Sequence, residues 1–381
     1  FITNNGKKRI PRKIACIIIF IYMQVLIGLR NINYGGVDTQ VYARDFMRII
    51  NQNYSFIDIF SGFFKDFGFY LFAKLFSLFS SNMNAWIFVS ALPYTIGVTW
   101  LIYTYSENIF ISFIMFLSYG FYLYNFQLMR HVFALGIIVL AFKFLQEEQY
   151  KKYFIAVIIA TFCHTIAILF LGAYFVQKGK IGAKQLGWVV FGGILVLCIS
   201  QPAILSILFK VLPFLGGERF SKFQTRGGNL TGDFIIQLFF ICICWYYLNV
   251  KGYQNNIEKS NTDMKYINYS KGKIIFNIKN NNYIPHYVNM TGLVNMAIVG
   301  YVFYLMTIVI SESYRMAQYF SLFTIILVPN TLVYIKNKKM KYIIYLIIVL
   351  FGIKHFFGGL FVEGGVYNPY VFYWQATQRL Y

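Results

Sequence analysis

The arginines of this 381-residue chain follow a different distribution from its lysines, and this difference points most directly to chemistry. Of the 24 lysines, 19 fall in five basic segments: Lys7–Lys13, Lys143–Lys152, Lys178–Lys184, Lys251–Lys279 and Lys336–Lys341. Eight of the 10 arginines lie elsewhere: Arg30, Arg44, Arg48, Arg130, Arg219, Arg226, Arg315 and Arg379. A guanidinium is planar, permanently charged and matches phosphate oxygens in pairs. We therefore expect an anionic ligand at these arginines, although pairing with acidic residues such as Asp66 and Glu312 as structural clamps is the alternative.

Arg130 is the strongest single candidate. It stands in Gln127-Leu-Met-Arg-His131, immediately before a long apolar run, so it falls in the first turn of the helix expected there. The amides exposed at a helix N-terminus favour anions. A charge at the edge of an apolar run is costly and usually functional. We predict that Arg130 takes part in catalysis by holding a phosphate.

A second group lies in Arg30–Phe46. Gly35-Gly36 permits a tight turn, and Asp38 can then cap the helix that follows. Asp38 and Tyr42 are four residues apart and share a helix face. Asp38 is accordingly a candidate for a base or a ligand of sugar hydroxyls, with capping alone as the alternative. Arg30 and Tyr42 are candidate substrate-binding residues.

His164 lies at the midpoint of an apolar run, and histidine is the side chain most easily tuned for proton transfer near neutral pH. A buried histidine that only completes the core is the alternative. Further candidates for binding substrate are Glu312 and Arg315, which can also simply pair, and Arg219 in the glycine-containing loop Gly216–Phe220. We expect no metal site and no cofactor, since no metal-ligand spacing occurs.

These residues must be positioned by membrane helices. Hydrophobic residues make up 58% of the chain and charged residues only 12%, which excludes a soluble enzyme, a disordered chain and a coiled coil. We expect an all-α polytopic membrane protein, GT-C-like, with about 10–12 transmembrane or re-entrant helices in one transmembrane domain, 1–381. The expected spans are Ile14–Leu29, Ala85–Tyr105, Ile109–Asn125, Leu128–Leu145, Phe154–Val176, Leu186–Ile199, Phe234–Val250, Met290–Ile310, Met316–Ile335 and Tyr342–Phe357. Because the chain starts at Phe1, we also expect a further span before it.

Lysine and arginine bias sets the orientation. The five basic segments should be cytoplasmic, including a loop over 251–288, which leaves a loop with an interfacial helix at 30–84 and a loop at 210–233 on the outer side. This pattern requires Phe154–Val176 to be a hairpin bent near His164; one straight helix followed by a weakly basic outer loop is the alternative. The basic residues behind the net charge of +21 thereby fall into two groups: lysines, most of which set the orientation from the cytoplasmic side, and arginines, most of which lie on the outer side.

The order of these motifs resembles the EpsG-like family of Wzy-type polysaccharide polymerases. The matching residues, spread over residues 14–340, are Arg30, Gly36, Asp38, Tyr42 and Phe46, then Arg130 and Ala134, then Phe162 and His164, and finally Arg315, Tyr319 and Phe320. Arg30 departs from the usual pattern because it precedes Asp38 by eight residues rather than a few.

The resemblance implies an enzyme of the bacterial plasma (inner) membrane that joins undecaprenyl-pyrophosphate-linked oligosaccharide repeat units into a capsular, exopolysaccharide or O-antigen chain at the outer face. Arg130, Arg315 and Arg219 would hold the departing pyrophosphate, and Asp38 or His164 would take the acceptor proton. The expected partners are the lipid-linked oligosaccharide, the bilayer, a chain-length regulator and a flippase, with no nucleic acid. A lipid-linked oligosaccharide flippase or exporter, an O-antigen ligase and a membrane O-acyltransferase are the alternatives.

Overall fold

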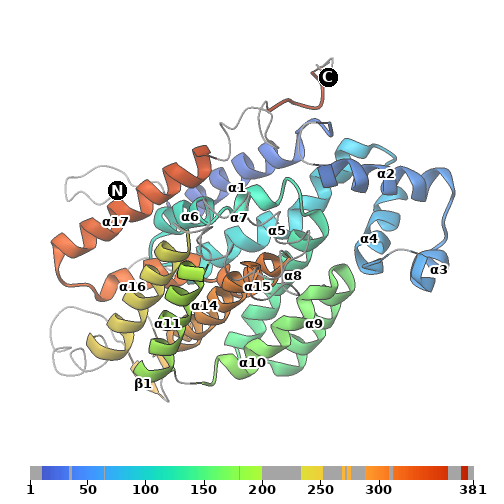
Figure 1. Cartoon of the computed structure of the whole chain (residues 1–381). Coiled ribbons are helices and arrows are strands. Elements are labelled where there is room, and N and C mark those ends of the chain that lie inside the picture. Colours follow the sequence, from blue (N-terminus) through green and yellow to red (C-terminus); the bar gives the residue numbers. More distant parts are fainter. Residues whose placement is uncertain are drawn as a thin grey trace. The chain divides into compact units, whose positions relative to one another are not determined.

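The fold was analysed in a computed structural model, which describes residues 11–33, 37–63, 65–179, 181–199, 233–251, 268–270, 273–275, 288–308, 312–358 and 370–375 (Figure 1). The chain divides into two compact units, one made of Phe1–Ile168 with Lys338–Tyr381 and the other of Leu169–Asn337. The structure is helical almost throughout, which confirms the expected all-α class. In the described residues the exception is a two-stranded antiparallel sheet, β1 (Asn268–Ser270) with β2 (Lys273–Ile275).

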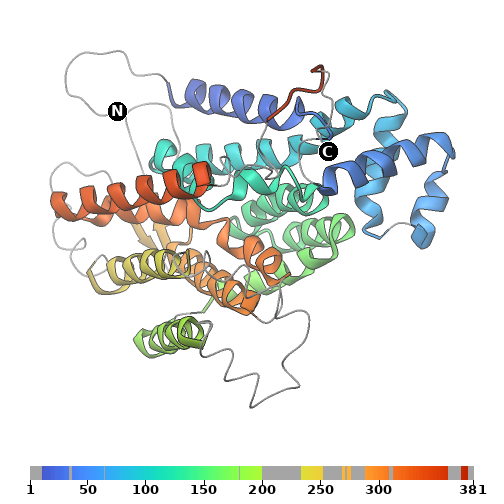
Figure 2. The same ribbon diagram turned by 45° about the horizontal axis from the view of Figure 1, so that its top comes forward.

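Four helices form the centre of the first unit: α1 (Arg12–Gly28), α5 (Met83–Tyr105), α8 (Met129–Gln146) and α9 (Tyr150–Cys163). α5 packs against both α1 and α8, and α8 packs against α9 (Figure 2). A glycine permits the close approach of α8 to α5, because a Cβ at Gly136 would lie 2.4 Å from the Pro93 carbonyl. Gly136 faces Pro93, and Phe142 further along α8 contacts Tyr105, so the two helices run in the same direction.

The segment between α1 and α5 forms α2 (Val37–Asn51), α3 (Phe56–Asp58), η1 (Ile59–Phe63) and α4 (Phe67–Ser77). α4 packs on α2 and α9. Aromatic rings join α2, α4 and α5: Trp86 stacks on Phe46 at 5.3 Å and meets Phe69 edge to face. A Cβ at Gly68 would lie 2.8 Å from the Phe162 backbone, so α4 touches α9 directly. The helix expected in this polar segment is therefore present and anchored to the unit.

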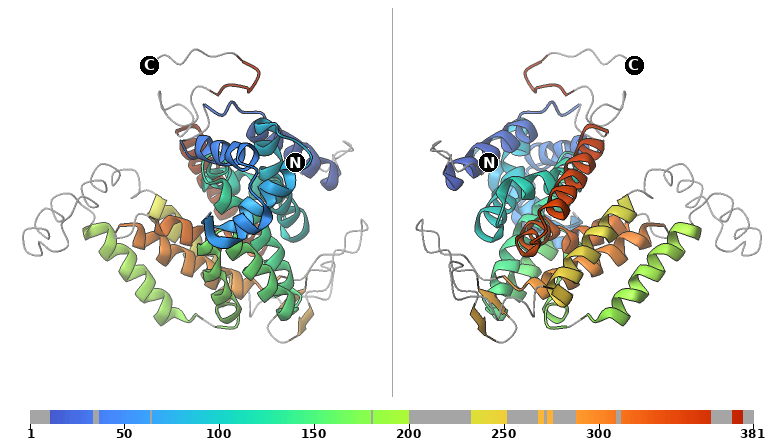
Figure 3. Two further views of the ribbon diagram at one scale, coloured as in Figure 1. Left: turned by 90° about the vertical axis from the view of Figure 1, so that its right-hand side faces the viewer. Right: turned by 90° about the vertical axis from the view of Figure 1, so that its left-hand side faces the viewer.

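The remaining helices of this unit are α6 (Ile109–Ser118), α7 (Phe121–Tyr124), α17 (Lys338–Gly352) and its continuation η7 (Ile353–Phe357). α17 lies against α6, as the right-hand view of Figure 3 shows. The segment Ile109–Asn125, predicted as one span, is not one continuous helix: Gly120 adopts a left-handed conformation (φ 71°) between α6 and α7, and this conformation interrupts the helix.

The second unit contains the last part of η2 (Thr165–Gly172), α10 (Ala173–Val176), α11 (Ala183–Ile199), a helix at Asp233–Asn249, α14 (Met290–Leu305), α15 (Ser313–Ser321), α16 (Thr324–Thr331) and η6 (Leu332–Tyr334). The Asn295 amide on α14 donates to the carbonyls of Val176 (2.9 Å) and Gly179 (2.7 Å). These bonds satisfy the end of α10, whose last carbonyls have no partner within the helix.

Three described helices are long and apolar enough to cross a membrane: Met83–Tyr105, Met129–Gln146 and Lys338–Phe357. A fourth span results if Ser313–Ser321 and Thr324–Tyr334, which meet at a bend of 43°, count as one. Other apolar helices are shorter, including Ile109–Ser118, Thr165–Val176, Asp233–Asn249 and Met290–Leu305. The chain is therefore a membrane protein, with several of the expected spans present as short or broken helices.

Candidate functional site

Arg130 lies in the first unit, in the first turn of α8, where the sequence places it. Its Nη1 forms an ion pair with Asp66 Oδ2 at 3.2 Å and donates to the Lys65 carbonyl at 3.1 Å. The Asp66 side chain is only 3% exposed, whereas that of Arg130 is 24% exposed. The carboxylate is thus removed from water while part of the guanidinium faces outward. α8 begins at Met129 with no side-chain cap at Leu128, so its N-terminal end adds a positive potential beside Arg130.

Two tyrosines flank the same guanidinium. The Arg130 Cζ lies 5.4 Å from the ring centroid of Tyr42 and 5.9 Å from that of Tyr70. The Tyr70 hydroxyl donates to Asp45 Oδ2 at 2.6 Å. Burial and this hydrogen bond raise the pKa of Tyr70, which lies on α4, outside the predicted membrane spans, so its phenol stays protonated. Rings on the faces of a cation stabilise it, so the two tyrosines add to the ion pair with Asp66 in fixing the Arg130 guanidinium.

Asp66 links this cation to the predicted histidine. It adopts a left-handed conformation (φ 62°, ψ 51°) just before α4, and its Oδ1 accepts the backbone N–H of Thr165 at 3.0 Å and the Thr165 hydroxyl at 2.6 Å. His164, the residue before, is extended (φ −156°, ψ 113°) and ends α9, and η2 begins at Thr165. The break that the sequence predicts near His164 is therefore present, and Asp66 caps the helix that follows it.

A second histidine accompanies His164. The ring of His131, the residue after Arg130, lies 5.0 Å from that of His164 at an interplanar angle of 77°. Both residues are buried, with His131 1% and His164 8% exposed. Each histidine adjoins a residue bonded to Asp66, His131 next to Arg130 and His164 next to Thr165. Histidine is the side chain most easily tuned for proton transfer, so this pair is a candidate for that role.

Asp38 and Arg30 lie next to this cluster. Asp38 is half-buried in the first turn of α2, one turn before Tyr42. Arg30 is 1% exposed, and its guanidinium donates to the carbonyls of Ile27 and Phe126 and to the Thr39 hydroxyl. It thus joins the end of α1, the start of α2 and the corner before α8, and its ring partner is Phe126 at 5.1 Å.

The other predicted site residues either belong to the second unit or are not among the residues that the structure describes. Arg315 Nε pairs with Glu312 Oε2 at 3.0 Å across one helical turn at the start of α15, with side chains 27% and 53% exposed. This pairing is the structural clamp that the sequence offered as the alternative for these two residues. Arg219 lies outside the described residues.

Sequence reasoning did not select Asp45, Asp66, Tyr70, His131 or Thr165 as functional. Asp66 was considered only as a clamp, and its place in an aromatic segment gave a usable signal, because charges in such segments need buried partners. His131, adjacent to Arg130, was judged weaker than His164. In the described part of the chain, no three His, Cys, Asp or Glu side chains gather in a way that could hold a metal ion.

The fold and the site together define a polytopic membrane protein with a cationic, carboxylate-anchored cluster at the start of one apolar helix. Comparison with protein families assigns that class. The EpsG family matches residues 13–372, nearly the whole chain, and the protein therefore belongs to the EpsG family, a Wzy-type polymerase-like family. This membership supports a polysaccharide polymerase-like role in general terms. No curated protein and no solved structure matches the chain.

Proposed function

We propose that this protein is a glycosyltransferase of the bacterial plasma membrane that joins oligosaccharide repeat units carried on undecaprenyl pyrophosphate, working at the outer face. The observation that carries the proposal is the cluster around Arg130: a partly exposed guanidinium, held from behind by a buried carboxylate and on its faces by two tyrosines, at the N-terminus of a membrane helix. A pyrophosphate leaving group requires a fixed cation of this kind.

The reaction transfers the growing chain from its lipid pyrophosphate to a hydroxyl of the next lipid-linked unit. The acceptor oxygen bonds to the anomeric carbon, the bond from that carbon to the pyrophosphate oxygen breaks, and undecaprenyl pyrophosphate leaves with the bonding electrons. The acceptor proton passes to a base. Arg130 stabilises the charge that develops on the leaving group, and the N-terminal end of α8 adds to this field.

His164 and Asp38 are the two candidates for that base. His164 adjoins Thr165, which shares Asp66 with Arg130, and its ring contacts His131, a second imidazole that could take the proton on. Asp38 stands one helical turn from Tyr42, on whose ring Arg130 rests. Tyr42 is itself 7% exposed, so in this proposal it supports Arg130 rather than stacking on a sugar ring.

The remaining candidates support the site. Arg30 fixes the start of α2 through Thr39 and thereby positions Asp38. For Glu312, Arg315 and Arg219 the substrate-binding role stays a prediction from the sequence, and for the first two the ion pair between them is the structural alternative. The polymer is a capsular, exopolysaccharide or O-antigen chain, and a chain-length regulator and a flippase act with the enzyme.

Reconstitution tests this proposal. Purified protein in vesicles is incubated with a lipid-linked repeat unit, and the products are separated on a gel. A ladder of products that differ by one repeat unit is expected. Movement of the unit across the bilayer without elongation would identify a flippase, and a single transfer to a different acceptor lipid would identify a ligase; either result would contradict the proposal.

A further inference from the structure

A groove on the first unit opens between α1 and α5, away from the Arg130 cluster. Its volume is about 270 Å³. The floor is formed by Cys16 and Thr99, which are 3% and 9% exposed, and the walls by apolar side chains that include Ile17, Phe20 and Ile96. This volume lies at the lower limit for ligand pockets, and the lining suits a single hydrocarbon chain rather than a sugar.

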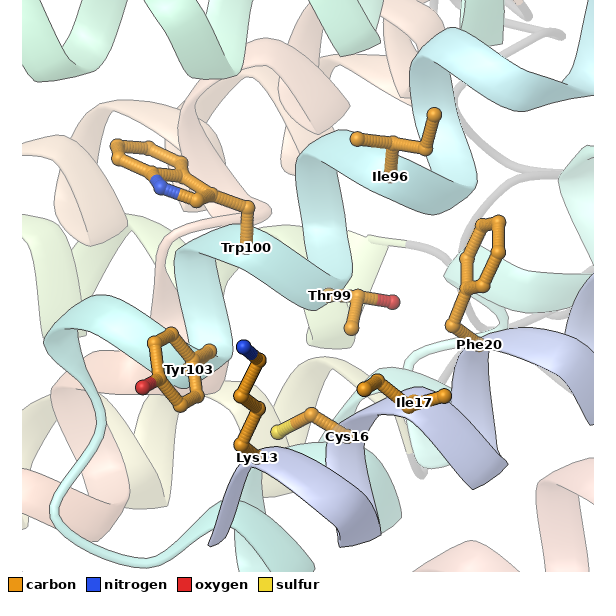
Figure 4. A pocket seen from close by; sticks show the side chains of 8 residues that line it. All are labelled: Lys13, Cys16, Ile17, Phe20, Ile96, Thr99, Trp100 and Tyr103. Carbon is orange, nitrogen blue, oxygen red and sulfur yellow. The ribbon is translucent and has the colours of Figure 1, made fainter.

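One end of this groove is cationic and aromatic. Lys13, Trp100 and Tyr103 line that end, and Figure 4 shows the Lys13 side chain reaching from α1 toward α5, between Tyr103 and Thr99. A lysine with an apolar stem and a charged tip, beside tryptophan and tyrosine, is typical of the membrane interface. The groove therefore combines an apolar channel with a positive charge at the depth of lipid headgroups.

Lys13 is the cation among the residues that line the groove, and two neighbouring basic residues, Arg12 and Lys143, have partners outside it. Arg12 donates to the carbonyls of Ile102 and Tyr103 at the end of α5, at 3.0 and 2.7 Å for its Nη2. Lys143 lies over the Trp100 ring at 5.8 Å and is 4.0 Å from Glu147. Arg12 holds α1 to α5, and Lys143 is shared with a carboxylate, whereas the Lys13 ammonium points into the groove.

The position of the groove separates it from the proposed active site. Trp86 stacks on Phe46, which is one turn from Tyr42 beside Arg130. Trp100 stands 14 residues further along α5, which is about 21 Å along a helix axis. Because the hydrocarbon core of a bilayer is roughly 30 Å thick, a headgroup at Lys13 lies near the opposite membrane surface from a pyrophosphate at Arg130. The same lipid molecule cannot have its phosphates at both places.

We propose that this groove binds an anionic phospholipid, with one acyl chain between α1 and α5 and the headgroup phosphate on Lys13. The bound lipid fills the gap between two helices that Gln24 of α1 joins further along, through the Phe88 carbonyl and the Thr95 hydroxyl of α5. The proposal is independent of the proposed transferase activity. The occupant is a phospholipid of the leaflet at the Lys13 end, not the lipid-linked substrate.

Fluorescence quenching tests the site, because Trp100 lines the groove. A variant that keeps Trp100, with the four other tryptophans replaced by phenylalanine, is reconstituted in phosphatidylcholine vesicles containing brominated phosphatidylglycerol or brominated phosphatidylcholine. We expect quenching by phosphatidylglycerol at a lower mole fraction than by phosphatidylcholine. Lys13→Gln should reduce this preference about fivefold, the effect of one basic residue at a membrane surface, and Lys13→Arg should keep it.

Lys339→Gln is the matched control, because it removes an exposed lysine of α17 that does not line the groove. It should leave the preference unchanged. As a second measurement that retains all tryptophans, native mass spectrometry of the full chain from mixed lipid should show retained phosphatidylglycerol in the parent protein and loss of it in Lys13→Gln. Equal quenching by both lipids, an unchanged preference in Lys13→Gln, or displacement of phosphatidylglycerol by an equal amount of polyprenyl phosphate would overturn the proposal.

Discussion

Asp66 offers the most informative perturbation of the site, because two elements, α8 and η2, depend on its carboxylate. It pairs with Arg130 on α8 at 3.2 Å and caps the start of η2 through Thr165, while its own backbone is left-handed. Asn is the substitution of choice. Asparagine tolerates the left-handed conformation, whereas alanine would add about 1–2 kcal/mol of backbone strain. Asn also keeps one oxygen that can accept from Thr165, so the change chiefly removes the charge.

The expected cost follows from the burial of the two partners. Breaking a fully buried ion pair costs about 3–5 kcal/mol, but the Arg130 side chain is 24% exposed and recovers part of this through water. Weakening the charge-assisted bonds to Thr165 adds about 0.5–1 kcal/mol. We expect Asp66→Asn to lower the free energy of unfolding by about 2–3 kcal/mol, measured by equilibrium unfolding in mixed micelles.

A double-mutant cycle separates the ion pair from the cap. In an Arg130→Gln background the charge of Asp66 has no partner, so Asp66→Asn should cost about 1–2 kcal/mol less than in the parent. In cells that produce the polymer with either single variant in place of the parent protein, at equal protein level, polymer chain length should fall. Additive unfolding free energies in the cycle, with full-length polymer from Asp66→Asn, would refute the role assigned to this carboxylate.

Three further predictions concern the elements around the site. Gly68→Ala should shift α4 away from Phe162 and shorten the polymer, as seen on a gel, whereas normal polymer would show that this contact is dispensable. Arg30→Met should lower the free energy of unfolding by about 3 kcal/mol or more, because it strands buried carbonyls at the helix junction; a change below 1 kcal/mol would contradict that packing. The Ser55 backbone and hydroxyl hydrogen bonds lower the pKa of Asp58, so the cap of α3 persists above the ordinary Asp pKa and is lost as pH falls through the lowered value. Ser55→Gly removes the hydroxyl bond and keeps the backbone bond, so carboxyl NMR should show a pKa of Asp58 that is higher than in the parent but still below normal; an unchanged pKa would contradict this.

The sequence was sufficient to predict the helical membrane class and the positions of most helices, because long apolar runs admit little else. From the orientation that the basic segments impose, the sequence also predicted a hairpin near His164, and the structure shows that the α-helix ends there. The sequence could not predict the interruption of Ile109–Asn125, since a glycine inside an apolar run is compatible with a continuous helix until tertiary packing selects the left-handed conformation of Gly120.

The site was predictable only in part. Arg130 stands out in the sequence as a charge at a helix start, and Tyr42 through its spacing from Asp38. Asp66 stands out only as a charge in an aromatic segment, because nothing local indicates that its partner is an arginine 64 positions later. That contact depends on the close packing of α4 on α9 at Gly68, a long-range property of the fold.

The central claim is that Arg130 holds the leaving pyrophosphate, and the rate of one coupling step tests it most directly. Parent protein, Arg130→Gln and Arg48→Gln are compared with a lipid-linked repeat unit under single-turnover conditions; Arg48 is an exposed arginine of α2 bonded to Gln52 and serves as the control. We predict a loss of about 10²–10³-fold in Arg130→Gln, partial activity in Arg130→Lys, and a parental rate in Arg48→Gln. A parental rate in Arg130→Gln would contradict the account.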